Sequence, residues 1–114
     1  MRAGIDIVEV SRIETLMRQY DRRFLERVFT GSEIAYATRK RRPAESLAGR
    51  FAAKEAFMKA VGRRLSWKEI EIGMDGQKPA LVYRGNVYPA VSISHEKAYA
   101  VAVVVLPEQK GALS

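Results

Sequence analysis

Residues 51–62 read FAAKEAFMKAVG, a peptide that holds two lysines, one glutamate, two phenylalanines and four alanines. The wider segment from Pro43 to Gly62 is dense in Ala, Leu, Lys and Glu, which are good helix formers, and Gly49 is its only internal helix breaker. Proline suits the first turn of a helix, and glycine suits the position just past its end. The sequence therefore predicts one long helix from Pro43 to Gly62, the strongest helix prediction in the chain.

Shorter helices are predicted before this long one. Ser11 fits a helix N-cap, and apolar residues then recur at steps of three and four, which predicts an amphipathic helix. A second helical patch follows it, with Phe24, Leu25, Val28 and Phe29 as its apolar residues. The segment Thr30-Gly31-Ser32-Glu33 matches a capping box, so a further helix is expected to begin there and to end before Pro43.

Strands are predicted at the start of the chain and in its C-terminal half. Residues 3–9 (AGIDIVE) alternate Ile5 and Ile7 with Asp6, which predicts a strand with two different faces. Four later segments are rich in β-forming residues: EIEIGM, PALVYR, VYPAVSISH and YAVAVVVL. They are separated by Asp75-Gly76, Gly85-Asn86 and the connection 95–98. The elements together predict an α+β fold, with a small antiparallel sheet packed against a long helix and shorter helices.

The size and composition of the chain limit its class. It has 114 residues, 47% of them hydrophobic, which predicts one domain over 1–114 with a modest core that a partner subunit would supplement. The absence of cysteine excludes disulfides and thiolate metal sites. Nothing resembles a signal peptide, and the longest apolar run, Ala98 to Leu106, falls short of the roughly 20 residues of a membrane helix. We predict a soluble, cytoplasmic protein whose residues 107–114 form a loose tail.

The positive charge of the chain lies on its N-terminal side. The formal net charge is +7; residues 1–64 hold 15 Lys and Arg against 8 Asp and Glu, whereas residues 65–114 hold 5 of each. Such a field favours an anionic partner, which can be nucleic acid, an anionic membrane, a phosphorylated small molecule or an acidic protein. Charge alone does not choose among these partners.

Glu55 and Lys59 are the first candidate site. They lie four residues apart, so the predicted helix places them on one stripe with Ala48, Ala52 and Gly62. One interpretation is an ordinary exposed ion pair. The other is a functional site, for which the small neighbouring residues leave open space.

Asp6 offers a second carboxylate to such a site. Mg²⁺ prefers a few protein oxygens completed by water and substrate phosphate, so Asp6 and Glu55 would suit it, with Lys59 on the phosphate. A half-buried acid in a strand also caps turns or pairs with arginine. The sequence spacing of the two carboxylates does not distinguish these roles.

The segment Ser92-Ile93-Ser94-His95-Glu96 is the second candidate site, because a predicted strand ends there in hydroxyl groups and the chain's only imidazole. A hydrolase is disfavoured, since no glycine-flanked nucleophile elbow surrounds either serine. An anion-binding site and a turn-capping histidine are equally good interpretations. The basic run 39–42 (RKRR) is likewise either a solvated helix end or a phosphate clamp.

Four motifs in one order carry a family resemblance: GIDIVEVSRIE, FTGSE, FAAKEAFMKAVG and SISHEKAYAVAVVV. With them the sequence resembles bacterial holo-[acyl-carrier-protein] synthase, the short, single-domain class of 4′-phosphopantetheinyl transferase, over roughly residues 3 to 106. Members of this family move the phosphopantetheine arm of coenzyme A onto a serine of acyl carrier protein and release adenosine 3′,5′-bisphosphate. The resemblance implies the same fold and activity for this chain.

The resemblance also implies roles for single residues. Asp6 and Glu55 would hold Mg²⁺ beside the coenzyme A pyrophosphate, and Lys59 would contact the phosphates. The nucleotide side of the site is expected at Gly62, Lys78, Pro79, Ser94 and His95. The attacking hydroxyl belongs to the carrier protein, so the chain needs a general base but no nucleophile of its own. Two candidates for the base stay open: a water held by the metal or by Glu55, and Glu96.

The expected partners are coenzyme A and an acidic acyl carrier protein, with no nucleic acid or membrane. The resemblance points to helix 11–27 as the docking face, where basic residues surround an apolar centre: Arg12, Met17, Arg18, Arg22, Arg23 and Phe24. Short synthases are similar to one another in forming trimers with coenzyme A between subunits. A homotrimer is therefore expected, with Asp6, Glu55 and Lys59 from one subunit and residues 94–95 from its neighbour.

One segment departs from the family pattern. Many relatives follow the long helix with a Gly-x-Gly turn, whereas this chain continues Gly62-Arg63-Arg64. Arg63 either replaces a lost backbone contact to phosphate or faces solvent, and the sequence does not decide between these roles.

The alternative function, from a different class, is a noncatalytic basic module that binds nucleic acid or an anionic protein. Its support is the net charge of +7. The chain lacks the interleaved aromatic residues that are typical of single-strand binders, which favours the transferase.

Overall fold

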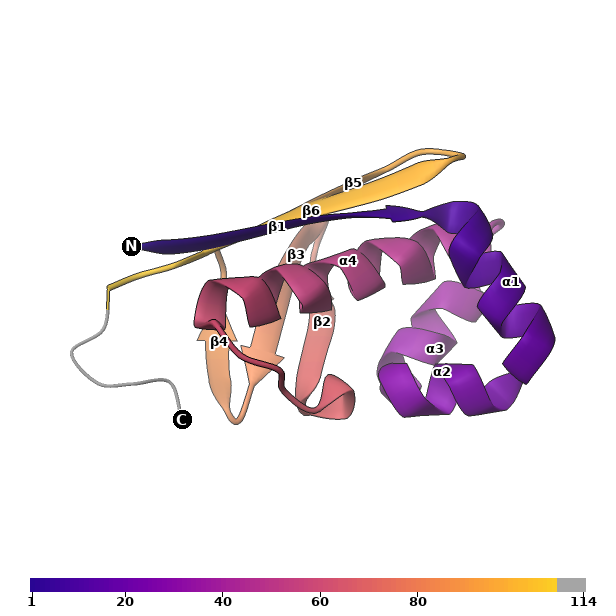
Figure 1. The fold of residues 1–114 in the computed structure, drawn as a ribbon, viewed down its shortest axis with the longest axis horizontal. Helices are drawn as coiled ribbons and strands as arrows, with labels where there is room; N and C mark the ends of the chain where they lie inside the picture. The colour runs from indigo at the N-terminus through magenta and orange to yellow at the C-terminus, as the bar shows by residue number, and fades with distance from the viewer. Residues whose placement is uncertain (109–114) are drawn as a thin grey trace.

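The structure, a computed structural model, describes residues 1–108 of the chain. The elements in chain order are β1 (Arg2–Glu9), α1 (Val10–Tyr20), α2 (Arg22–Val28), α3 (Gly31–Thr38), α4 (Pro43–Val61), the short 3₁₀ helix η1 (Trp67–Glu69), β2 (Ile70–Asp75), β3 (Lys78–Tyr83), β4 (Asn86–Tyr88), β5 (Val91–His95) and β6 (Tyr99–Leu106). Figure 1 shows their arrangement, with the first and last strands side by side.

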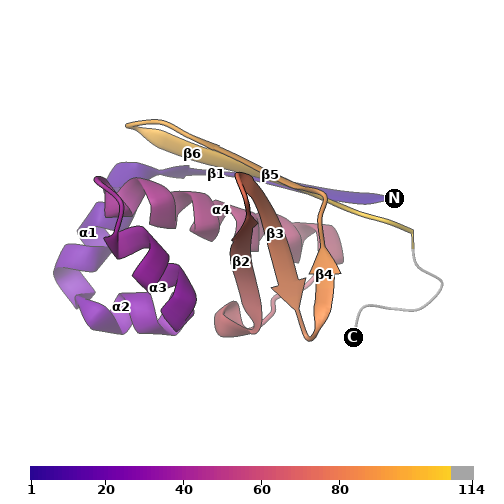
Figure 2. The same cartoon turned by 180° about the vertical axis from the view of Figure 1, so that it is seen from behind.

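Helix α4 is the centre of the fold. A sheet with strand order β1-β6-β5 lies over one side of α4, a second sheet with order β2-β3-β4 crosses another side, and α1, α2 and α3 gather at its N-terminal end (Figures 1 and 2). Because α4 is covered from several directions, 14 of its 19 residues are buried. Its many alanines allow this coverage, since small side chains let both sheets approach the helix closely.

Strand β1 lies against α4 at a distance that requires glycine. A Cβ atom on Gly4 would overlap the carbonyl oxygen of Ala56 and would lie 2.9 Å from the backbone nitrogen of Ala60. Asp6 shares this inward face, whereas Ile5 and Ile7 point away from the helix and are 62% and 65% exposed. The predicted strand with two different faces is therefore confirmed, and its polar residue is the one that faces α4.

Two helix predictions are confirmed by the capping geometry. Pro43 stands at the first position of α4, and Gly62 follows its last residue with a left-handed φ of 93°. The capping box at the start of α3 is also formed: the N–H of Glu33 donates to Thr30 Oγ1, and the N–H of Thr30 donates to Glu33 Oε1 at 2.8 Å. Helix α3 ends at Thr38, before the proline as expected.

The predicted N-cap of the first helix is wrong. The helix begins at Val10 with Glu9 as its N-cap, so Ser11 is not the cap residue. The predicted second helical patch is confirmed as α2, and the docking segment 11–27 is not one continuous helix, because Asp21 has a φ of 54° and separates α1 from α2. This break lets α2 turn back towards the core, where Val28 and Phe29 are buried.

The single predicted sheet is two three-stranded sheets. The segment VYPAVSISH divides at Pro89-Ala90, so that β4 completes one sheet and β5 enters the other. The turn before β4 lies on Arg84-Gly85, whose φ values of 49° and 81° suit a tight hairpin, and Asn86 opens the strand. The prediction of antiparallel pairing is confirmed throughout the described strands.

The ends of the described chain lie near each other. The Met1 ammonium group lies 3.0 Å from Glu108 Oε1, and Pro107 and Glu108 are exposed beyond the last strand. Residues 109–114 of the predicted tail lie outside the described residues. Among residues 1–108, no helix is both long enough and apolar enough to span a membrane.

Candidate active site

The first predicted site lies at the junction of β1 and α4. The Lys59 ammonium nitrogen lies 3.0 Å from Asp6 Oδ1 and also 3.0 Å from the carbonyl oxygen of Ile5. The close approach of Gly4 to the helix holds the Asp6 side chain at this junction. The structure thus brings together an aspartate from the first strand and a lysine from the long helix, although 52 residues separate them in the sequence.

Glu55 belongs to the same stripe of α4, one turn before Lys59, but its partner is not the lysine. Both of its carboxylate oxygens accept hydrogen bonds from Arg64, Oε2 from Nη1 at 3.2 Å and Oε1 from Nη2 at 3.1 Å. The interpretation of Glu55 and Lys59 as an ordinary helical ion pair is therefore wrong. The left-handed turn at Gly62 reverses the chain past the end of α4, which brings Arg64 back over Glu55.

The donor set of this junction fits a hard divalent cation. The side chains of Asp6 and Glu55 are 16% and 19% exposed, and each carboxylate already lies beside a basic side chain. Residues 1–108 contain no group of three or more His, Asp or Glu side chains arranged for a metal. Mg²⁺ often uses only one or two protein carboxylates and takes its other ligands from water and substrate phosphates, so two carboxylates suffice for it.

A cationic cavity of about 440 Å³ forms the second site. It lies between the α3–α4 connection, β5 and the β2–β3 turn, and basic residues dominate its polar lining: Lys40, Arg41, Arg42, Arg50 and His95. The His95 ring nitrogen Nδ1 lies 2.9 Å from Glu45 Oε1. This hydrogen bond, with the nearby Arg42, lowers the pKa of Glu45. The cavity is suited to a phosphorylated ligand.

Arg50 is the residue of this cavity that sequence reasoning missed. It is only 6% exposed, its guanidinium carbon lies 4.2 Å from the centre of the Tyr36 ring, and Nη1 donates to Ser46 Oγ. Its Nε has no hydrogen-bond partner in the described structure. Burial lowers the pKa of Arg50, and an unpaired buried donor is costly unless a ligand satisfies it. The sequence offered one signal for this buried site: a basic residue stands between Gly49 and Phe51, in a helix of mostly small and apolar residues.

The other predicted nucleotide residues are spread over both ends of α4. Pro79 lines the cationic cavity. The Lys78 ammonium group donates to the carbonyl of Pro89, and Ser94 lies on the opposite strand face from His95, so neither lines this cavity. Gly62 caps the far end of α4, by helix length roughly 18 Å from Arg50 and roughly 25 Å from Glu45 of the cavity. A single chain therefore does not bring all of these residues together.

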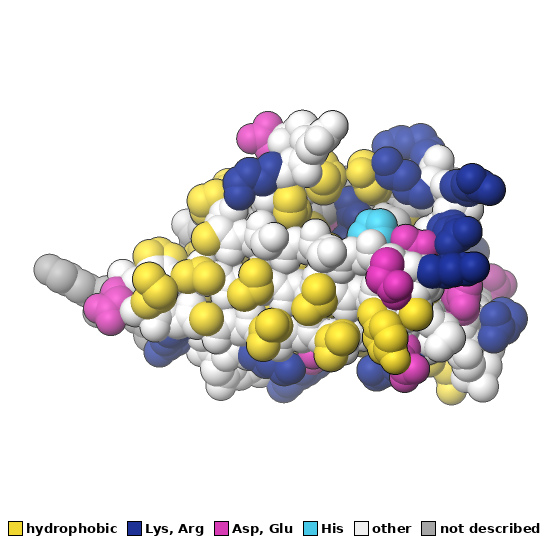
Figure 3. All heavy atoms as spheres, turned by 90° about the horizontal axis from the view of Figure 1, so that it is seen from above, with side chains coloured by type: hydrophobic (Ala, Val, Ile, Leu, Met, Phe, Trp, Pro, Cys, Tyr) yellow, Lys and Arg dark blue, Asp and Glu magenta, His cyan; other side chains and the backbone are white. Residues whose placement is uncertain are grey.

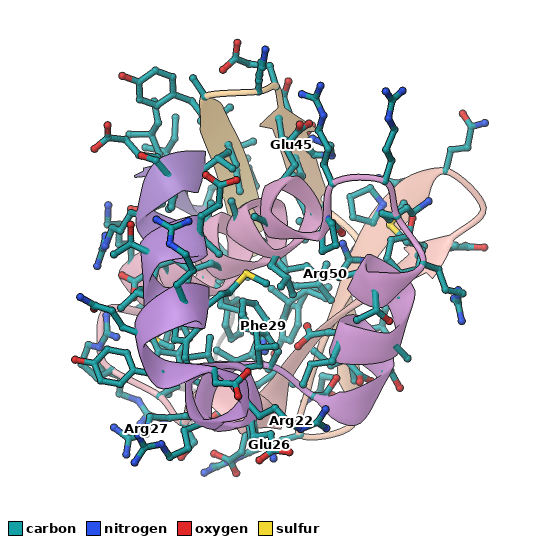
Figure 4. The ribbon with its side chains drawn as sticks, turned by 90° about the vertical axis from the view of Figure 1, so that its right-hand side faces the viewer. Arg22, Glu26, Arg27, Phe29, Glu45 and Arg50 are labelled. Carbon is teal, nitrogen blue, oxygen red and sulfur yellow. The ribbon has the colours of Figure 1, made fainter. Side chains whose placement is uncertain are left out.

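The predicted docking residues lie on the exposed side of α1 and α2. Figure 4 views this end, with Phe29 inside the cluster of helices and Arg22 and Arg27 at its rim. The four arginines of the predicted set are exposed, whereas Met17 and Phe24 are partly buried against the core. Arg12 lies over the Phe51 ring, and Arg22 pairs with Glu26. Arg12, Arg18, Arg22 and Arg23 thus form a basic rim, and the apolar residues between them are mostly buried.

A second cavity, of about 650 Å³, adjoins this rim. Met17 and Arg18 of α1 line it together with Arg41, Arg42 and Lys97. From the basic run at 39–42, Arg41 and Arg42 thus line both cavities, and Lys40 lines the first.

Comparison with curated proteins gives relatives of the same length. A holo-[acyl-carrier-protein] synthase from Chloroherpeton thalassium is 45% identical over 121 aligned positions, and the alignment covers 96% of this chain and 100% of the relative. The protein of the same name from Thermus thermophilus is 43% identical over 112 aligned positions, and that alignment covers 90% of each chain.

Solved structures agree with this relationship. The chain matches a holo-(acyl-carrier-protein) synthase from Bacillus anthracis in complex with CoA (3′,5′-ADP), with a TM-score of 0.79, 41% identity and coverage of 90% of this chain and 92% of that one. The enzyme from Neisseria meningitidis matches with a TM-score of 0.84 and 32% identity, over 94% of this chain and 98% of that one.

A family model described as the 4′-phosphopantetheinyl transferase superfamily matches residues 2–104. The match includes both sheets and every helix described above, so the agreement concerns the whole fold and not one motif. The chain belongs to the 4′-phosphopantetheinyl transferase superfamily.

Proposed function

We propose that this chain transfers the 4′-phosphopantetheine group of coenzyme A to a serine of apo-acyl carrier protein, giving holo-acyl carrier protein and adenosine 3′,5′-bisphosphate. Curated relatives at 43% and 45% identity carry the name of this activity. Similar structures from Bacillus anthracis and Helicobacter pylori are complexes with coenzyme A. The observation that carries the proposal is the contact of Lys59 with Asp6, one helical turn from Glu55, in a chain that matches these enzymes over its length.

Asp6 and Glu55 are proposed to hold Mg²⁺ between β1 and α4. A bound Mg²⁺ would neutralise the negative charge that develops on the pyrophosphate as its link to the pantetheine arm is broken. Lys59 is close enough to Asp6 to point its ammonium group at the same phosphates, and its second contact, with the Ile5 carbonyl, fixes its position.

The acceptor serine comes from the carrier protein, so the chain supplies a base for its proton. Glu96 is a poor candidate, because its Oε1 already accepts hydrogen bonds from the N–H groups of Ala98 and Tyr99 and closes the β5–β6 turn. The remaining candidate for the proton acceptor is a water molecule held at the metal, or by Glu55 once its pair with Arg64 has opened.

Coenzyme A is proposed to bind between subunits of a homotrimer. The Asp6 junction lies along β1, and the cationic cavity lies beside β5, and these two strands are opposite edges of one sheet. One chain therefore offers a metal half and a nucleotide half at opposite edges of this sheet. A neighbouring subunit would bring its cavity to the Asp6 junction.

The outer face of the same sheet is a suitable interface. Figure 3 shows apolar side chains gathered over this face, beside the histidine and a group of basic residues. Ile5 pairs in register with Val103, and Ile7 with Val101, so that these side chains form a continuous apolar surface. Such surfaces on soluble proteins often mark protein contacts. Sedimentation of the purified chain as a monomer at micromolar concentration would contradict the trimer.

The basic rim on α1 and α2 is proposed to receive the acidic carrier protein. Its exposed arginines, Arg12, Arg18, Arg22 and Arg23, would steer an acidic surface towards the nearby cavities.

The activity is tested by mass spectrometry of an apo-carrier protein incubated with the chain and coenzyme A. The carrier should gain the mass of one phosphopantetheine, and it should do so only when Mg²⁺ is present. If an apo-carrier that a known synthase modifies gains no mass, the transferase proposal fails. Equal modification in the presence of excess chelator would overturn the magnesium assignment alone.

A further inference from the structure

Arg64 holds the Glu55 carboxylate by both oxygens, unlike Lys59 at Asp6. The guanidinium group donates to both oxygens of Glu55, at 3.1 and 3.2 Å, whereas Lys59 contacts only Oδ1 of Asp6. A guanidinium group stays protonated in proteins, so Arg64 carries a full positive charge beside Glu55. Glu55 therefore has both oxygens engaged by one cation.

The position of Arg64 is fixed by two features of the chain. The left-handed turn at Gly62 brings the backbone back towards α4, and the guanidinium carbon lies 5.4 Å from the centre of the Trp67 ring. Trp67 in turn stacks on Phe51 at a centroid distance of 5.0 Å. Arg64 thus lies between a carboxylate and an aromatic face, at a position where the family resemblance leads one to expect glycine.

We propose that Arg64 is a positioning residue that occupies Glu55 in the metal-free protein and that a divalent cation must displace it. This inference rests on the proposed role of Asp6 and Glu55 as metal ligands. Mg²⁺ binds a carboxylate oxygen at about 2.0–2.1 Å and prefers its own octahedral arrangement of ligands, which a bidentate guanidinium on the same carboxylate obstructs. The two cations also repel each other.

The Arg64 side chain is able to leave. It is 66% exposed, so water is available to the guanidinium group when the pair opens. Exposed ion pairs contribute little to stability, and a metal ion with a second carboxylate is a strong competitor for Glu55. Lys59 does not need to leave Asp6 in the same way. Its contact with the Ile5 carbonyl holds it in place even when one Asp6 oxygen binds a metal.

Metal binding without coenzyme A tests the competition directly. Mn²⁺ serves as the probe, and the electron paramagnetic resonance signal of free Mn²⁺ reports the bound fraction for the wild type, Arg64→Gln and Arg27→Gln. Arg27→Gln is the matched control, because it removes the same charge from an exposed residue of α2 at the rim (Figure 4). Arg64→Gln should bind Mn²⁺ about two- to fivefold more tightly than the wild type, and Arg27→Gln should match the wild type.

Trp67 provides a second readout, since it is the only tryptophan of the chain. Addition of Mg²⁺ should change its emission in the wild type, because the guanidinium leaves the indole face, and should leave the emission of Arg64→Gln unchanged. Equal Mn²⁺ affinity of Arg64→Gln and the wild type, with the same Mg²⁺ response of Trp67 in both, would overturn the competition while leaving the magnesium site intact. Absence of Mn²⁺ binding to every variant would overturn the magnesium assignment and this inference together.

Discussion

The ammonium nitrogen of Lys54 lies 2.8 Å from Oε1 of Glu33, and both side chains are fully buried. Lys54 also donates to the carbonyls of Val28 and Trp67, so all three of its donors are used. The other oxygen of Glu33 accepts from the N–H of Ile72. This pair therefore connects α2, α3, α4 and β2 at a single point in the core.

Replacing Lys54 by methionine should lower the free energy of unfolding by ~3–5 kcal/mol, because it leaves the Glu33 carboxylate buried without its partner. Lys68→Met is the matched control at an exposed lysine and should change stability by no more than about 0.5 kcal/mol. Urea unfolding followed by Trp67 fluorescence measures the free energy of unfolding of both variants and of the wild type. Similar stability of the two variants would show that the buried pair contributes little.

Asp6→Asn and Glu55→Gln should each reduce the rate of holo-carrier formation by about a hundredfold or more, since each removes a charged metal ligand while keeping the side-chain shape. Asp75→Asn, at an exposed acid of the β2–β3 turn, should retain full activity. Rates come from mass spectrometry of the carrier, and circular dichroism checks the fold. Wild-type rates for both ligand variants would contradict the metal site.

Arg50→Gln should weaken binding of adenosine 3′,5′-bisphosphate by about tenfold, because the buried guanidinium of the cationic cavity would lose its interaction with phosphate. Lys68→Gln removes the same charge from an exposed site outside the cavity and should bind normally. Isothermal titration calorimetry measures the affinities. If the two variants bind equally well, the phosphates lie elsewhere.

Gly4→Ala should destabilise the protein by about 1–3 kcal/mol, because the added methyl group would overlap the Ala56 carbonyl and push β1 away from α4. The same shift would move Asp6 from Lys59, so transfer activity should fall with stability. Gly73→Ala is a strand control whose added methyl group meets no atom within 4 Å. Thermal unfolding should give a lower melting temperature for Gly4→Ala than for Gly73→Ala. Equal melting temperatures would contradict the close approach of β1 to α4.

The pH dependence of the cationic cavity should follow Glu45. His95 and, less strongly, Arg42 lower its pKa below the usual 4.5 through hydrogen bonds to the carboxylate. Because the folded-state pKa is the lower one, the carboxylate contributes stability above pH 4.5 that is lost as the pH falls through the folded-state value. An NMR titration of the Glu45 carboxyl should show this lowering, and His95→Ala should largely remove it. An unchanged pKa in that variant would contradict the pairing.

Local signals in the sequence predicted the elements that local forces determine. Pro43, Gly62 and the Thr30–Glu33 capping box mark helix ends through their own backbone chemistry, and the β-rich segments after Gly62 indicate strands by composition. The division of the strands into two sheets depends on which edges meet in space, and no local pattern contains that information. No local pattern indicates the break at Asp21 either, because the burial of Phe29 in the tertiary structure stabilises it.

The candidate site was predicted in part. The resemblance supplied Asp6, Glu55 and Lys59, and the structure brings Asp6 and Lys59 into contact. The resemblance could not supply Arg50 or Arg64. The surroundings of Arg50 depend on which elements cover α4, and the contact of Arg64 with Glu55 depends on how the chain turns after α4. Lys54 was equally hidden, because a lysine beside a glutamate on a helix looks solvated until its surroundings are known.

The pairing of β1 with β6 has a consequence for synthesis of the protein on the ribosome. Asp6 lies on β1, whose only hydrogen-bonded neighbour strand among residues 1–108 is β6, and β6 ends at Leu106. A nascent chain in which β6 is not yet made already contains Asp6, Glu55 and Lys59, but its first strand lacks this hydrogen-bonded neighbour. The β1 side of the candidate site is therefore completed only after β6 has left the ribosomal exit tunnel.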